Sequence, residues 1–94
     1  MFCGGYVSGS NGAQANNVGR VTSSCIRLST GKYQITYLTA YPNNNYTPSA
    51  ICYVSGTPSP CFACIGSTTG ATKLEVNTFV SNVITDCNFY FKVF

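Results

Sequence analysis

Apolar and polar side chains alternate with a period of two along several short segments, and this alternation most constrains the fold. In residues 87–94, Cys87, Phe89, Phe91 and Val93 fall on one face of an extended chain, while Asn88, Tyr90, Lys92 and Phe94 fall on the other. Residues 20–28 and 32–39 alternate in the same way. A strand with one face in a core and the other toward water has this pattern.

Strand signals recur at short intervals and are separated by clusters of Gly, Pro, Asn and Ser. The expected strands cover residues 2–8, 20–28, 32–39, 46–54, 62–66, 73–79 and 87–94. Ser29-Thr30-Gly31 predicts a hairpin turn with Gly31 at positive φ. Pro48 predicts a strand start or an edge position, because proline cannot donate to a ladder. We therefore expect an all-β fold, a small antiparallel β-sandwich, in a single domain covering residues 1–94.

The amino-acid composition favours strands and argues against two classes of partner, nucleic acids and membranes. Charged residues are 7% of the 94 residues, against about 25% in an ordinary soluble domain, and the helix formers Lys and Glu are correspondingly scarce. The basic residues are scattered, whereas nucleic-acid binding needs a clustered basic face. No stretch approaches the roughly 20 apolar residues that span a bilayer. We expect neither nucleic-acid binding nor membrane insertion.

The chain lacks the usual means of acid–base catalysis. It contains no histidine, and its two carboxylates, Glu75 and Asp86, lie in different segments. Glu75 is expected as an exposed strand residue opposite a lysine, and Asp86 as a turn residue. The sequence therefore predicts a protein that is not an enzyme and that uses no cofactor.

Six cysteines are the most unusual feature of the composition. They fit a disulfide framework, whose connectivity the sequence does not determine, or buried thiols that fill strand positions. Cys61-Phe62-Ala63-Cys64 has the spacing of half a zinc site, but no second pair of ligands follows it at similar spacing. In a strand, moreover, Cys61 and Cys64 would point to opposite faces. We expect no metal centre, and the choice between thiols and disulfides remains open.

The order of the segments resembles the C-terminal domains of bacteriophage tail fibres. Those domains commonly show a strand, a hairpin of the form Thr-Gly-x-Tyr-x-Val/Ile-x-Phe, a loop ending in Asn-Tyr, and a closing alternating strand. The matching segments cover nearly the whole chain: Phe2-Cys3-Gly4-Gly5, Val21-Thr22-Ser23-Ser24, Arg27-Leu28-Ser29-Thr30-Gly31-Lys32-Tyr33-Gln34-Ile35-Thr36-Tyr37, Tyr41-Pro42-Asn43-Asn44-Asn45-Tyr46 and Asp86-Cys87-Asn88-Phe89-Tyr90-Phe91-Lys92-Val93-Phe94.

The resemblance implies a homotrimeric fibre head. In this interpretation the domain is a viral receptor-binding tip, located on the virion and extracellular when it acts, that attaches to a host cell-surface glycan or protein receptor. Two alternatives belong to other classes. One is a structural trimerisation or decoration domain of a virion, and the other is a secreted, disulfide-stapled, lectin-like adhesin.

Candidate receptor-binding residues are polar or aromatic and are expected in loops, where binding residues on a rigid sandwich usually lie. Asparagine and glutamine amides exchange hydrogen bonds with sugar hydroxyls, and tyrosine rings stack on sugar rings. The candidates are Asn11, Gln14, Asn16, Tyr41, Asn43, Asn44 and Asn45.

Overall fold

A computed structural model describes residues 1–42, 46–53 and 60–94. Within these residues the chain forms β-strands and no helix. The strands are β1 (Cys3–Val7), β2 (Gln14–Val18), β3 (Ser23–Ser29), β4 (Lys32–Tyr37), β5 (Pro48–Tyr53), β6 (Cys61–Ile65), β7 (Lys73–Val80), β8 (Val83–Ile84) and β9 (Asn88–Val93).

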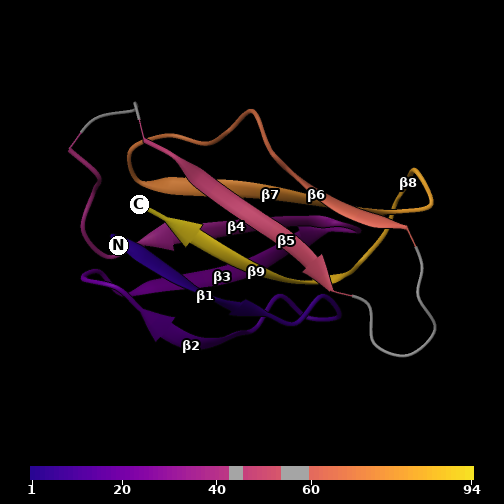
Figure 1. Cartoon of the computed structure of the whole chain (residues 1–94), viewed down its shortest axis with the longest axis horizontal. Helices are drawn as coiled ribbons and strands as arrows, with labels where there is room; N and C mark the ends of the chain where they lie inside the picture. Colours follow the sequence, from indigo (N-terminus) through magenta and orange to yellow (C-terminus); the bar gives the residue numbers. More distant parts are fainter. Residues whose placement is uncertain (43–45, 54–59) are drawn as a thin grey trace.

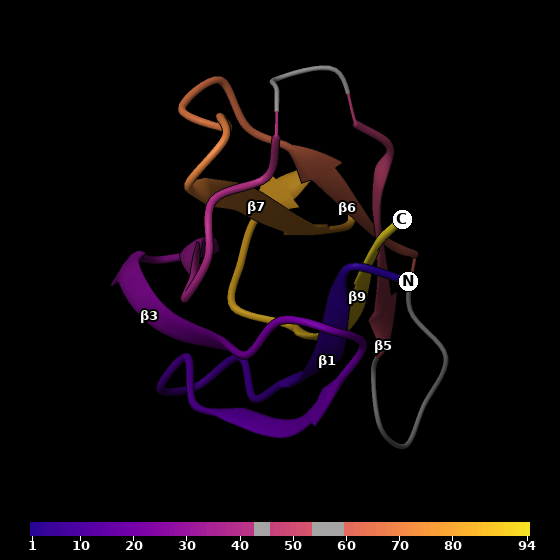
Figure 2. The same cartoon turned by 90° about the vertical axis from the view of Figure 1, so that its left-hand side faces the viewer.

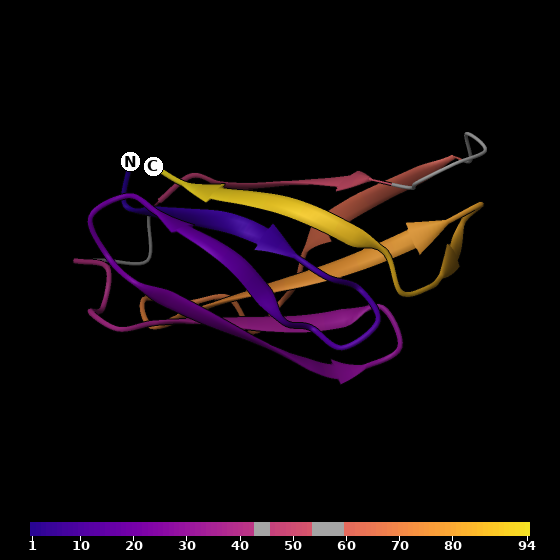
Figure 3. The same cartoon turned by 90° about the horizontal axis from the view of Figure 1, so that it is seen from below.

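The strands form two antiparallel sheets that pack face to face. One sheet has the order β2-β1-β9-β5, and the other has the order β3-β4-β7-β6 with the short β8 paired to β7. Figure 1 shows the strands along the long axis of the molecule, and Figure 3 shows the two layers from below. In the view along the long axis, β1, β5 and β9 lie on one side of the core, with β3 and β7 on the other (Figure 2). The expected all-β fold with two antiparallel sheets is confirmed.

The inward faces of both sheets make one core. The alternating residues of β9 and β4 that share a face in the sequence are the ones that are buried, and Tyr33, Phe89 and Ile35 have no exposed surface. The ring of Tyr33 packs against that of Phe89 with centroids 5.1 Å apart. Burial of side chains this large supplies about 2–3 kcal/mol each, so the aromatic centre dominates the stability of a small core.

Several local predictions are confirmed. Gly31 lies in the β3–β4 turn with φ of 69°, where a residue with a Cβ atom would be strained. Pro48 is the first residue of β5, and β5 is an edge strand. The position of Pro48 at the start of β5 and the edge position of β5 both follow from the missing N–H of proline.

Two strands were not expected from the sequence. β2 has the sequence QANNV, without alternation, and four of its five residues are exposed. β2 is a strand because its backbone forms hydrogen bonds with β1 at the edge of the sheet. Burial of an apolar face is not what stabilises it. β8 is only two residues long, which is too short for a periodicity to be visible.

The assignment of residues to the core predicts that substitution of Phe89 destabilises the protein strongly and that substitution of Tyr90 destabilises it only slightly. Phe89→Ala should lower the free energy of unfolding by about 3–5 kcal/mol, because it removes a fully buried ring and leaves a cavity. Tyr90→Ala, on the opposite face of β9, should cost about 1 kcal/mol. Urea unfolding of both variants measures this, and equal losses would contradict the assigned faces.

Candidate functional site

Three tyrosines lie on the outer face of the four-stranded sheet, and we call Tyr6, Tyr53 and Tyr90 the tyrosine face. Tyr90 in β9 is opposite Tyr6 in β1, and their ring centroids are 4.9 Å apart. Tyr53 in β5 is 6.4 Å from Tyr90. Tyr90 is 50% exposed and Tyr53 is 46% exposed. The sheet thus presents two exposed aromatic rings to solvent, with the half-buried ring of Tyr6 next to that of Tyr90.

A shallow groove of about 180 Å³ adjoins the tyrosine face on the side of β2. Tyr6 and Tyr90 form part of its lining, together with Asn16 of β2 and Lys92 of β9. Asn16 has φ of 65°, a left-handed conformation that asparagine tolerates better than most residues. The groove therefore combines aromatic rings, a polar strand residue and one cation.

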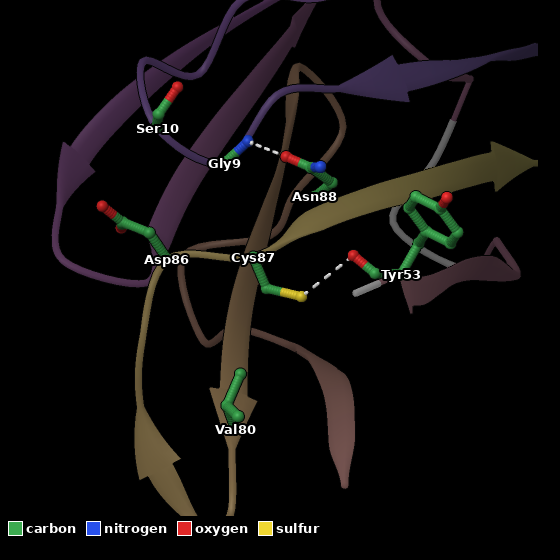
Figure 4. Close-up of a pocket in the computed structure, with 7 residues that line it drawn as sticks. All are labelled: Gly9, Ser10, Tyr53, Val80, Asp86, Cys87 and Asn88. Carbon is green, nitrogen blue, oxygen red and sulfur yellow. Dashed lines mark hydrogen bonds between the residues drawn. The ribbon is translucent and has the colours of Figure 1, made fainter. Parts of the chain in front are cut away.

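A larger pocket of about 410 Å³ lies at one end of the sandwich, beyond the ends of β1, β5 and β7 (Figure 4). The described residues that line it are Gly9, Ser10, Tyr53, Val80, Asp86, Cys87 and Asn88. Tyr53 belongs to this end pocket and also to the tyrosine face. The two features therefore meet at Tyr53.

The hydroxyl group of Tyr33 holds the end pocket together from inside the core. It donates a hydrogen bond to the carbonyl oxygen of Gly9 at 2.8 Å and accepts one from the backbone N–H of Cys87 at 3.3 Å. A Cβ atom on Gly9 would lie 2.5 Å from the carbonyl carbon of Cys87, so only glycine fits there. The backbone N–H of Gly9 in turn donates to Asn88 Oδ1 at 2.8 Å (Figure 4).

Asp86 connects the same end of the sandwich to the β3–β4 hairpin. Its Oδ1 accepts from the backbone N–H of Gly31 at 2.7 Å, and its Oδ2 lies 3.0 Å from Nη2 of Arg27. Partial burial opposes ionisation of Asp86, but hydrogen bonds, chiefly those from Arg27 and Gly31, outweigh it and hold the pKa of Asp86 below its usual value. Asp86 therefore works as an ionised anchor.

Glu75 is part of a different network, so the structure does not pair the two carboxylates. It is buried, not exposed as the sequence suggested, because the turn after β6 covers it. Hydrogen bonds from Thr68, and also from Asn77, lower the pKa of Glu75. Each carboxylate is held by donors of its own, and neither is positioned as a proton donor to the other.

The structure separates the Cys61–Cys64 pair and brings Cys61 close to two other cysteines. Cys64 is exposed, whereas Cys61 points inward, and its Sγ lies within 4.8 Å of those of Cys52 and Cys87. All six cysteines are free thiols in the structure. Burial raises the pKa of Cys52 to about 12 and also raises that of Cys87. Both groups are therefore protonated at neutral pH, which disfavours a role as nucleophiles.

The residues predicted to bind a receptor are placed unequally. Asn11 lies in a turn and caps it by accepting from the backbone N–H of Ala13 at 2.9 Å. Gln14 and Asn16 are in β2 rather than in a loop, which corrects that expectation. Gln14 reaches across to Ser23 in the other sheet at 3.1 Å, so it ties the two sheets together. Of the candidates among the described residues, Asn16 lines the groove beside the tyrosine face.

The half-buried ring of Tyr41 packs against other aromatic rings of the domain. Its ring lies 4.7 Å from that of Phe2 and 4.6 Å from that of Tyr46, and its hydroxyl donates to the carbonyl oxygen of Phe94 at 2.7 Å. The remaining candidates, Asn43, Asn44 and Asn45, lie outside the described residues.

Sequence reasoning missed the residues that the structure brings together on the outer sheet face. The alternation pattern predicts strands at Tyr6, Tyr53, Tyr90 and Lys92 but does not indicate that these residues lie together. The sequence does contain one indication. In the alternation of residues 87–94, Tyr90 falls on the outward face with Asn88 and Lys92, where a polar residue is ordinarily found. An aromatic side chain at such a position is an exposed apolar group, and a patch of these marks a binding surface more often than a single one does.

Comparisons of the chain with protein-family models, with curated proteins and with solved structures found no match. Across residues 1–42, 46–53 and 60–94 there is no helix with the length and apolar character needed to cross a membrane. The class of the protein therefore rests on the fold itself, which is all-β with two antiparallel sheets.

The electrostatic role of Asp86 predicts a specific dependence on pH. Because its folded pKa is lowered, the stability that Asp86 contributes is present above its unfolded pKa and is lost as the pH falls through the folded value. Between about pH 5 and pH 2, wild-type protein should lose more free energy of unfolding than Asp86→Asn does. Urea unfolding across this range measures the difference. Parallel losses in the two proteins would show that the contacts of Asp86 do not stabilise the folded state.

Proposed function

We propose that this domain is the receptor-binding tip of a viral fibre and that it attaches the virion to a cell-surface glycan through the tyrosine face and the end pocket. The observation that carries the proposal is the row of three tyrosines on one sheet face, in which Tyr53 and Tyr90 are exposed and Tyr6 is half-buried beside Tyr90. The resemblance of the sequence to tail-fibre domains supports the viral assignment.

The chemistry of this surface suits a neutral or weakly acidic sugar. Tyrosine rings offer flat apolar faces on which the C–H groups of a pyranose stack, while their hydroxyls remain available to water or ligand. Asn16 and Lys92 lie beside the rings in the groove, and Asn88 lies in the end pocket. A few polar groups next to aromatic faces are the usual composition of a small-ligand site.

The resemblance to tail-fibre domains is the basis for proposing a homotrimer, and the second sheet offers an apolar surface for contact between copies. Ile26 and Leu28 are 54% and 49% exposed on the outer face of β3, which is an edge strand of the second sheet. Leu38, just beyond β4, is 80% exposed. Contact between copies at this edge would cover apolar surface and leave the tyrosine face free, because the tyrosines belong to the other sheet.

A second candidate function is a structural trimerisation or decoration domain, which the same exposed edge of β3 favours. In that case the tyrosine face would bind no receptor. The third candidate, a secreted lectin-like adhesin with disulfides, would use the same sugar-binding chemistry but would contain no free thiols under denaturing, non-reducing conditions. Thiol counting therefore separates it from a virion protein.

The proposal predicts that the tyrosines are needed for attachment. Tyr90→Ala and Tyr53→Ala should each weaken the ability of the soluble domain to compete with virus for cells by at least about tenfold, or about 1.4 kcal/mol, because each removes a stacking surface. Phe62→Ala is the matched control, since Phe62 is an exposed aromatic residue on the other sheet.

Light scattering of each variant completes this test. A loss of competition with an unchanged oligomeric state supports the proposal. Unchanged competition would remove the tyrosine face from the binding site, and loss of the trimer in the tyrosine variants would identify this face as the subunit interface instead.

A further inference from the structure

Three cysteines from distant parts of the chain meet at the side of the sandwich where β5 and β6 lie next to each other. Cys52 is in β5, Cys61 begins β6, and Cys87 directly precedes β9. Their Sγ atoms all lie within 4.8 Å of one another. Cys52 belongs to one sheet and Cys61 to the other, so the cluster bridges the two layers at this side.

We infer that Cys52, Cys61 and Cys87 form a metal site that binds one zinc ion through three thiolates. Thiolates without harder ligands select soft ions such as Zn²⁺. A tetrahedral zinc centre with bonds of about 2.3 Å holds its sulfur atoms about 3.8 Å apart. Sulfurs that already lie within 4.8 Å of one another need to approach by no more than about 1 Å, which side-chain torsions can supply.

The end pocket provides the fourth coordination position. Cys87 lines the pocket, Cys61 is the strand partner of Val80 in its wall, and Cys52 precedes Tyr53, which also lines it. Water entering this pocket can complete a tetrahedral shell. The site is therefore expected to hold zinc by three protein ligands and to present one exchangeable position to the pocket.

The binding step balances without an oxidant. Zn²⁺ forms three Zn–S bonds, three S–H bonds break, and three protons leave to solvent. No electrons are transferred, so the reaction proceeds in reducing conditions. A disulfide, by contrast, would need an oxidant and would join only two of the three sulfurs, leaving the third unpaired. A zinc ion, in contrast to a disulfide, binds all three thiol groups.

The bound ion would cross-link the two sheets. β5 and β6 are the edge strands of their sheets on this side, and a domain of this size has a modest core that benefits from a covalent or metal staple. This inference does not depend on receptor binding. The end pocket is common to both proposals, but metal titration and competition for cells are separate measurements, so the failure of one proposal can be told from the failure of the other.

The test uses the reduced, chelator-treated whole chain titrated with Co²⁺ and then with Zn²⁺. We expect one equivalent of Co²⁺ to give thiolate-to-metal charge-transfer absorption of the intensity due to three thiolates, and one equivalent of Zn²⁺ to displace it. Cys52→Ser, Cys61→Ser and Cys87→Ser should each weaken Zn²⁺ binding more than tenfold. Cys64→Ser, in the same strand as Cys61 but exposed, is the matched control and should bind as wild type does.

Alkylation of the wild-type protein gives a result that does not depend on how the variants fold. One equivalent of Zn²⁺ should protect Cys52, Cys61 and Cys87 while Cys64 stays reactive. The inference is overturned if Zn²⁺ protects none of the three, if Cys64→Ser weakens binding as much as the cluster variants do, or if protein prepared without oxidant already contains a disulfide between two of the three.

Discussion

The buried hydroxyl group of Tyr33 is the interaction on which the rest of the structure depends. Its ring is fully enclosed in the core, and its oxygen joins the chain after β1, through Gly9, to the chain before β9, through Cys87. Burial raises the pKa of Tyr33 to about 12, so the donor proton is present at any physiological pH. A buried polar group without partners is costly, and here the partners are the backbone atoms that shape the end pocket. Asp86 extends this network to the β3–β4 hairpin. Tyr33 therefore stabilises both the apolar core, through its ring, and the end pocket, through its hydroxyl group.

The strands and faces of the core follow from the sequence because period-two alternation directly reflects burial on one side of a sheet. The positions of Gly31 and Pro48 follow from the sequence for a different reason, because each residue has a backbone constraint that acts locally. β2 could not be predicted, because its polar residues form a strand only through pairing with β1. Glu75 is buried by a turn seven residues away from it, at Thr68, and no strand pattern contains that information.

The site was less predictable than the fold, because proximity on the sheet surface depends on strand order and not on sequence distance. Tyr6 and Tyr90 are opposite each other only because the first and last strands pair. Cys52, Cys61 and Cys87 meet because β5, β6 and the segment before β9 converge at one side of the sandwich. The one recognisable cysteine spacing, Cys61 to Cys64, is split between two faces of β6. Tyr41 was selected for its loop position, yet it packs on Phe2.

The central claim is that the outer face of the four-stranded sheet binds a sugar ligand while the opposite sheet does not. The most direct measurement is nuclear magnetic resonance of the isotope-labelled domain during titration with oligosaccharides released from the target cell surface. The account predicts that shift changes concentrate on the amides and rings of Tyr6, Tyr53, Tyr90 and Lys92 and leave the outer face of β3 and β4 unchanged. Changes confined to β3 and β4, or no change at saturating oligosaccharide, would contradict it.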